Sequence, residues 1–143
     1  MAEHRQLRIL SRAESLELLA SASVGRVVLT ANALPAALPV NYVVDGETVV
    51  FRTGAGIKLD AAERGTVVAF EADHFVDELR MGWSVLVVGV ARLLTDPVDL
   101  AHADLLAIPT WAELSPAGYV RVEIGSISGR FLAPVPAGAR AAG

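Results

Sequence analysis

Short apolar segments separated by turn residues dominate the chain and predict a protein built mainly from β-strands. These segments are rich in Val, Leu, Ile and Phe, and stretches with the 3.6-residue periodicity of an amphipathic helix are few. The predicted strands span residues 26–30, 36–44, 48–53, 66–73, 82–94 and 118–127, and residues 128–132 continue the last strand past a kink.

Three short helices interrupt the predicted strands. Ser11 and Glu14 have the spacing of a capping box, in which each side chain accepts a hydrogen bond from the backbone N–H of the other residue. Asp96 and Pro97 suit the N-cap and first position of another helix. The predicted helices span residues 12–21, 58–64 and 97–107.

The order of these elements favours a barrel over a layered α/β fold. No strand–helix–strand alternation runs through the chain, so a doubly wound parallel sheet is not expected. Six long, mostly sequential strands with a few short helices are typical of a closed antiparallel barrel with the helices packed outside it. We predict that residues 1–132 form this single mainly β domain and that residues 133–143, rich in Ala, Pro and Gly, form a loose tail.

Several turn and breaker residues refine the predicted strands. Asp45-Gly46 is a strong signal for a two-residue hairpin turn, and Gly89 suggests a bulge within its long strand. Residues 74–81 are predicted to be a polar connection. Pro39 cannot donate a ladder hydrogen bond, so it marks a sheet edge, a bulge or a place where something other than a strand lies alongside.

Composition excludes several classes of protein. Apolar residues make up 53% of the 143-residue chain, and we expect the excess apolar surface to form a subunit interface. The longest apolar run, Val85–Leu94, is too short to cross a bilayer, and no secretion signal is evident at the N-terminus. The absence of cysteine and the net charge of −4 argue against disulfides, cysteine-bound metal and nucleic acid as a main partner. We therefore expect a cytoplasmic protein without membrane or nucleic-acid partners.

The only lysine of the chain, Lys58, follows the glycine-rich turn Thr53–Ile57 at the start of a predicted helix. Glycines allow backbone N–H groups to approach an anion, a helix N-terminus adds positive potential, and an ammonium group neutralises the anion as a point charge. Arg52 and Thr53 end the preceding strand and can reach the same anion. The pattern predicts a phosphate pocket; the alternative is a plain turn with a solvated lysine. Walker and Rossmann spacings are absent.

Other residues are compatible with a bound aromatic group or with ordinary structure. The strand Leu38–Tyr42 contains Pro39, so its free backbone groups can bind a flat heteroaromatic ring, or the strand can be an irregular edge. Trp83 and Trp111 can pack in the core or cover such a ring. Glu71 and Asp73 share a sheet face, but no metal-ligand spacing links them to a histidine, and no metal site or catalytic side chain is assigned.

Taken together, these segments resemble the pyridoxamine 5′-phosphate oxidase-like flavin-binding split barrels, most closely the small bacterial branch related to nitroimidazole-resistance proteins. The resemblance covers residues 8–132 and depends on the order and spacing of several motifs. The matching segments are Val24–Val28, Leu38–Gly46, Val50–Leu59, Gly82–Val85, Pro109–Ala112 and Ser128–Arg130.

The resemblance implies a six-stranded split barrel that forms a homodimer with FMN in grooves at the interface. The residues matching the family's cofactor positions fall into three groups. They are Arg52, Thr53 and Lys58 for the phosphate; Leu38, Pro39, Val40, Asn41 and Tyr42 for the isoalloxazine ring; and Trp83 and Trp111, which approach the ring from the partner subunit.

The predicted function is that of an FMN-dependent oxidoreductase or flavin reductase that acts on a small-molecule electron donor or acceptor. Hydride chemistry belongs to the cofactor, and backbone N–H groups near Val40–Tyr42, with the Asn41 side chain, can stabilise charge on the reduced ring. Ile57 stands where pyridoxamine phosphate oxidases have arginine, so vitamin B6 oxidation is not expected. The alternatives are a deazaflavin-dependent reductase and a non-catalytic flavin or haem carrier or sensor.

Overall fold

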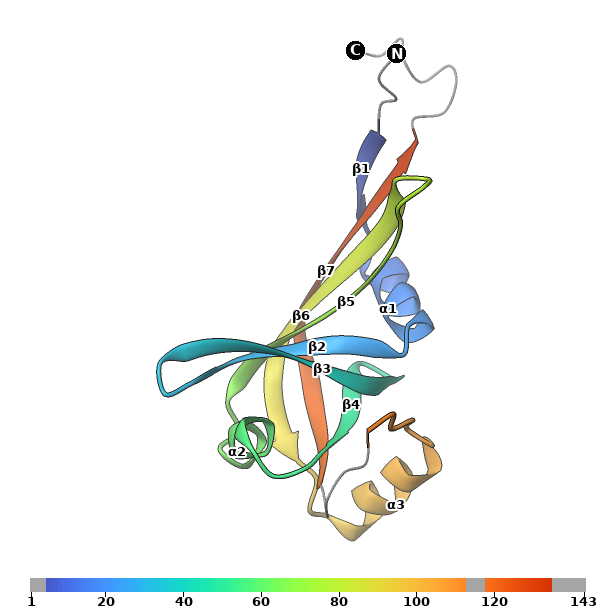
Figure 1. Ribbon diagram of the computed structural model, residues 1–143. Coiled ribbons are helices and arrows are strands. Elements are labelled where there is room, and N and C mark those ends of the chain that lie inside the picture. The colour runs from blue at the N-terminus through green and yellow to red at the C-terminus, as the bar shows by residue number, and fades with distance from the viewer. Residues whose placement is uncertain (1–4, 113–117, 135–143) are drawn as a thin grey trace.

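Seven antiparallel strands form one continuous sheet in the computed structural model, which describes residues 5–112 and 118–134 (Figure 1). The strand order is β1-β7-β4-β3-β2-β5-β6, and β6 also pairs with β7, which closes the barrel. The strands are β1 (Arg5–Leu10), β2 (Val24–Ala31), β3 (Leu34–Asp45), β4 (Thr48–Thr53), β5 (Val67–Val76), β6 (Met81–Leu93) and β7 (Gly118–Pro134). The helices are α1 (Arg12–Ser21), α2 (Ile57–Glu63) and α3 (Pro97–Leu105).

The predicted split barrel with short helices is confirmed, with seven strands in the described residues in place of six. The additional strand is β1, which pairs with the end of β7 from Leu10↔Gly129 to Arg5↔Pro134. β7 runs for 17 residues from Gly118 to Pro134, so residues 128–132 continue the last strand, as predicted. Residues 135–143 of the predicted tail lie outside the described residues.

Pairing between β5 and β6 replaces most of the predicted connection at 74–81. β5 continues to Val76 and β6 begins at Met81, so only residues 77–80 form the turn. This hairpin lies alongside β1 and the end of β7, on the side of the barrel away from α2 and α3 (Figure 1). β5 and β6 thus extend beyond the barrel as a long hairpin (Figure 1).

The helix caps follow the sequence closely. The Ser11 hydroxyl accepts a hydrogen bond from the Glu14 N–H, and the Glu14 carboxylate accepts one from the Ser11 N–H, as predicted. The Asp96 carboxylate likewise accepts a hydrogen bond from the Val98 N–H at the start of α3. α2 has no side-chain cap, since its N-cap is Gly56.

Two backbone irregularities set the geometry of neighbouring strands. Asp45 pairs with Thr48, so the hairpin turn consists of Gly46-Glu47, one residue later than predicted, and Gly46 supplies a φ of 60°. The register between β6 and β7 shifts at Gly89, where an irregularity was predicted, but the extra, unpaired residue is Gly125 of β7. A Cβ atom at Gly89 would lie 1.7 Å from the carbonyl oxygen of Glu123, so this approach requires glycine.

The barrel interior is filled by aliphatic and aromatic side chains from alternating strand positions. The rings of Tyr42 and Phe70 meet edge to face with their centroids 4.8 Å apart, and Leu19 of α1 is fully buried in the same core. The Tyr42 hydroxyl donates a hydrogen bond to the Leu19 carbonyl, which ties α1 to β3. Within the described part of the chain, no helix is long and apolar enough to cross a membrane.

Candidate functional site

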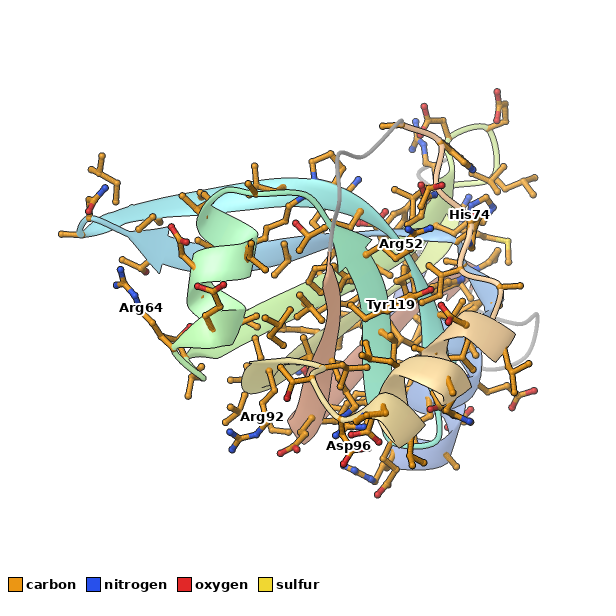
Figure 2. The ribbon with its side chains drawn as sticks, turned by 90° about the horizontal axis from the view of Figure 1, so that it is seen from below. Arg52, Arg64, His74, Arg92, Asp96 and Tyr119 are labelled. Atoms are coloured by element: carbon orange, nitrogen blue, oxygen red, sulfur yellow. The ribbon has the colours of Figure 1, made fainter. Side chains whose placement is uncertain are left out.

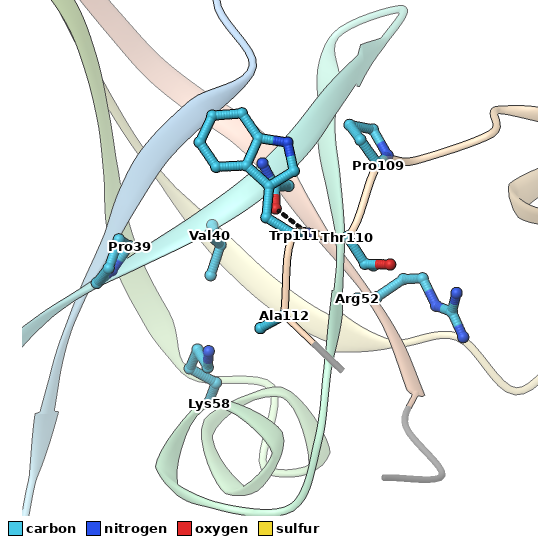
Figure 3. A pocket seen from close by; sticks show the side chains of 9 residues that line it. Pro39, Val40, Arg52, Lys58, Pro109, Thr110, Trp111 and Ala112 are labelled. Atoms are coloured by element: carbon cyan, nitrogen blue, oxygen red, sulfur yellow. Dashed lines mark hydrogen bonds between the residues drawn. The ribbon is translucent and has the colours of Figure 1, made fainter. Parts of the chain in front are cut away.

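A cleft opens where β3 and β4 separate. Their pairing extends only from Asp45↔Thr48 to Tyr42↔Phe51. Beyond that point β3 continues beside β2, whereas β4 continues beside β7. The cleft has a volume of about 110 Å³ and is open to solvent. Its lining comes from two strands, one helix and one loop segment: Pro39, Val40 and Asn41 of β3; Arg52 of β4; Lys58 of α2; and Pro109, Thr110, Trp111 and Ala112 (Figure 3).

Beyond Tyr42, the edge of β3 that faces this cleft is paired with no strand of the described residues. The Tyr42 N–H donates to the Ser23 carbonyl on the β2 side. Because backbone groups alternate between the two edges of an antiparallel strand, those of Asn41 and Pro39 face the opposite, cleft side. Pro39 therefore gives up no ladder hydrogen bond, and of the three placements predicted for it, a locally unpaired strand edge is the one observed.

Two cationic side chains lie in the cleft without an anionic partner. Lys58 is in the first turn of α2 and is partly buried, while Arg52 is exposed at the end of β4. Among the described residues, no carboxylate forms an ion pair with either cation. Burial lowers the pKa of Lys58, because nothing nearby offsets the cost of desolvating its charge. An anion in the cleft would supply that compensation.

The Asn41 side chain binds the Pro109–Ala112 segment, which forms one wall of the cleft. Its Oδ1 accepts a hydrogen bond from the Trp111 backbone N–H at 3.0 Å, and its Nδ2 donates to the Ser23 carbonyl at 3.3 Å. The Asn41 amide oxygen and one of its two Nδ2 hydrogens thus bind within the protein. The Trp111 indole is 76% exposed above the cleft (Figure 3). The sequence predicts a loop at Trp111, but no local pattern indicates its hydrogen bond to Asn41, which lies 70 residues away in the chain.

Three other predicted residues contribute to the site through their backbone or through packing. The side chains of Tyr42 and Thr53 are buried, and Leu38 packs against the core. The Thr53 hydroxyl donates to the Gly54 carbonyl, and burial strongly raises the pKa of Tyr42. Their side chains are thus used to hold the strands that border the cleft.

Trp83 lies apart from the cleft in the same chain. It is 7% exposed and stands opposite His74 in the β5–β6 register. Together with Ser23 and Asp73 it lines a second hollow, in the gap beyond the last β2–β5 pair, Arg26↔Glu71. A role for Trp83 at the cleft therefore requires a second chain.

The predicted carboxylate pair, Glu71 and Asp73, shares one arginine on the outer face of the sheet. The Nη1 atom of Arg26 lies 2.9 Å from a Glu71 oxygen and 3.3 Å from an Asp73 oxygen. Burial, together with the neighbouring Asp73 carboxyl, raises the pKa of Glu71 to about 7 against the opposing effect of Arg26. Two carboxyl groups thus share a single guanidinium group on this face.

The chain is similar to a family of known proteins over nearly its whole length. A family model described as pyridoxamine 5′-phosphate oxidase matches residues 11–131. The uncharacterized protein Rv0080 of Mycobacterium tuberculosis is 39% identical over 130 residues, which cover 87% of this chain and 85% of that protein.

Solved structures agree in fold. The FAD-binding protein from Mycobacterium smegmatis is 40% identical with a TM-score of 0.74, and the alignment covers 87% of this chain and 98% of that one. A conserved protein of unknown function from Corynebacterium diphtheriae is 32% identical with a TM-score of 0.72, and the alignment covers 90% and 98% of the two chains.

The raised pKa of Glu71 predicts a specific pH dependence of stability. Its pKa moves from 4.5 to about 7 on folding, so the folded chain binds the extra proton in that interval. The associated stability is complete below about pH 4.5 and is lost as the pH rises through about 7. In the wild type, the free energy of unfolding, measured by denaturant titration at several pH values, should decrease as the pH rises through about 7. In Glu71→Gln this decrease should be absent. Glu78→Gln, in the exposed β5–β6 turn, is the control and should keep it. A Glu71 carboxyl that titrates near 4.5 by NMR would contradict the assignment.

Proposed function

The chain belongs to the pyridoxamine 5′-phosphate oxidase family, and from this premise we propose that it is a flavin-binding oxidoreductase whose cofactor occupies the β3–β4 cleft. The observation that carries the proposal is that Lys58 and Arg52, neither of which forms an ion pair within the described residues, line one cleft together with the edge of β3. The 40% identity to the FAD-binding protein from Mycobacterium smegmatis supports the flavin as the ligand.

The cleft has the chemistry that a flavin nucleotide requires. The Lys58 ammonium and Arg52 guanidinium suit a phosphate, and the backbone groups of Pro39 and Asn41 suit the polar edge of a planar ring. Val40 and Pro109 add apolar surface for the ring faces.

The resemblance of the sequence favours FMN, whereas the M. smegmatis relative is described as binding FAD. Both molecules carry the isoalloxazine ring and a phosphate on the ribityl chain. The proposed contacts of Lys58, Arg52 and the β3 edge involve only this common part. We therefore propose a flavin nucleotide, with FMN as the smaller of the two candidates.

The chain's own residues would bind and orient the cofactor. A bound flavin supplies hydride and electron transfer between a small-molecule donor and acceptor. Lys58 and Arg52 hold the phosphate end, while the free N–H of Asn41 can donate to the ring and stabilise negative charge on it. The Asn41 clamp keeps the Pro109–Ala112 wall over the cleft and limits the access of water. No side chain is needed as an acid or base in this arrangement.

We further propose that a second copy of the chain completes the site. The outer sheet face of β5 and β6 exposes Val67, Leu86 and Val88 at 66%, 44% and 37%. Pro39 at the rim of the cleft pairs with Arg26, and Arg26 pairs with Glu71 of the same face. A chain that covered this apolar face would thus reach the cleft and bring its own side chains to the cofactor.

Replacing the cleft lysine tests the cofactor site. Lys58→Ala should weaken FMN binding by about 1.5–3 kcal/mol, because it removes a charged hydrogen bond to the phosphate. Flavin fluorescence titration of the apoprotein measures this change. Arg64→Ala, which removes a cation at the end of α2 outside the cleft, should leave the affinity unchanged. Equal affinity in Lys58→Ala and the wild type would refute the phosphate site.

A charge introduced on the outer face of β5 and β6 tests whether a second copy of the chain packs there. Sedimentation at micromolar concentration should show a dimer for the wild type and a monomer with weaker flavin binding for Leu86→Glu. Leu105→Glu alters a more exposed leucine on α3, away from this face, and should remain dimeric. A wild-type monomer that retains flavin would rule out the shared site.

A further inference from the structure

Arg52 does not stand alone at the cleft, because the sheet register places an aromatic ring beside it. Arg52 of β4 pairs directly with Tyr119 of β7, so both side chains project from the same face of the sheet. The Arg52 guanidinium carbon lies 5.5 Å from the centroid of the Tyr119 ring, within the range of a cation–π contact. Figure 2 shows the two residues side by side next to α3.

The Tyr119 ring is itself fixed by α3. Its hydroxyl donates a 2.6 Å hydrogen bond to an Asp104 carboxylate oxygen. This bond raises the pKa of Tyr119, so the phenol remains the donor at neutral pH. Asp104 lies near the end of α3, and the chain then continues directly into the Pro109–Ala112 wall of the cleft. A continuous set of contacts therefore links α3 to a cation in the cleft.

An exposed arginine normally samples many rotamers, and binding an anion then requires ordering of the side chain. A planar guanidinium stacked on an aromatic ring is ordered in advance, an arrangement that lysine cannot reproduce. No carboxylate of the described residues competes for Arg52, so its donors are available to a ligand. The ring orders the cation without neutralising it.

We propose that Tyr119 is a positioning residue that holds the Arg52 guanidinium ready for the flavin phosphate, and that Asp104 of α3 fixes the Tyr119 ring for this purpose. The proposal rests on the proposed function of the cleft, since it concerns the phosphate end of that ligand. Tyr119 acts only through Arg52 and need not touch the cofactor.

Comparison of FMN with riboflavin separates this role from a general structural one, because riboflavin has the same ring and lacks the phosphate. Tyr119→Val should weaken FMN binding about two- to fivefold, the scale of an exposed cation–π contact, and leave riboflavin binding unchanged. Asp104→Ala keeps the ring and should weaken FMN binding in the same direction. Asp99→Ala on the same helix removes only the 3.7 Å contact with Arg121 and should have no effect.

A double-mutant cycle completes the test. In an Arg52→Ala background, Tyr119→Val should cause no further loss of FMN affinity, because its only route to the phosphate is gone. Equal weakening of FMN and riboflavin, or an undiminished effect in the Arg52→Ala background, would overturn the role of Tyr119. If Lys58→Ala weakens FMN binding and Tyr119→Val does not, this inference fails while the proposed function stands. If the wild-type chain binds neither flavin, both fail.

Discussion

The separation of β3 from β4 after the Tyr42–Phe51 pair is the constraint on which the site depends. Each strand keeps its other neighbour beyond this point: β3 stays with β2, and β4 stays with β7. The hydroxyl of Tyr42 is tied to α1 and its ring packs on Phe70, so the last shared pair is anchored in the core. The gap cannot close without breaking one of these pairings, and it leaves backbone groups of β3 available to a ligand.

The charges around the gap are arranged for an anion. The chain has 16 acidic and 12 basic residues, yet the described cleft lining contains Lys58 and Arg52 and no carboxylate. Partial burial of Lys58 is unfavourable for its charge in the absence of a ligand. If the proposed function holds, binding energy from the phosphate would offset that cost, and the ring would be bound mainly through backbone contacts.

Much of this arrangement could be predicted from local signals in the sequence. The glycine-rich turn before Lys58, the proline in the strand and the two helix caps each have a direct local cause, and the cleft brings Pro39, Val40, Asn41, Arg52, Lys58 and Trp111 together. Features that depend on long-range register could not be predicted in this way. The pairing of β1 with β7, the clamp between Asn41 and Trp111, and the Arg52–Tyr119 pair join residues far apart in the chain. Trp83 lies outside the cleft because it belongs to the β5–β6 hairpin, where it pairs with His74, and this pairing also depends on long-range register.

The absorbance spectrum of the purified protein, combined with the mass of the molecule released on denaturation, tests the central claim most directly. The account predicts a flavin spectrum, either as purified or after incubation with FMN and FAD, with one flavin per chain and a released mass equal to one of these two nucleotides. A protein that stays colourless and takes up neither nucleotide would contradict the account, as would a haem spectrum with no flavin.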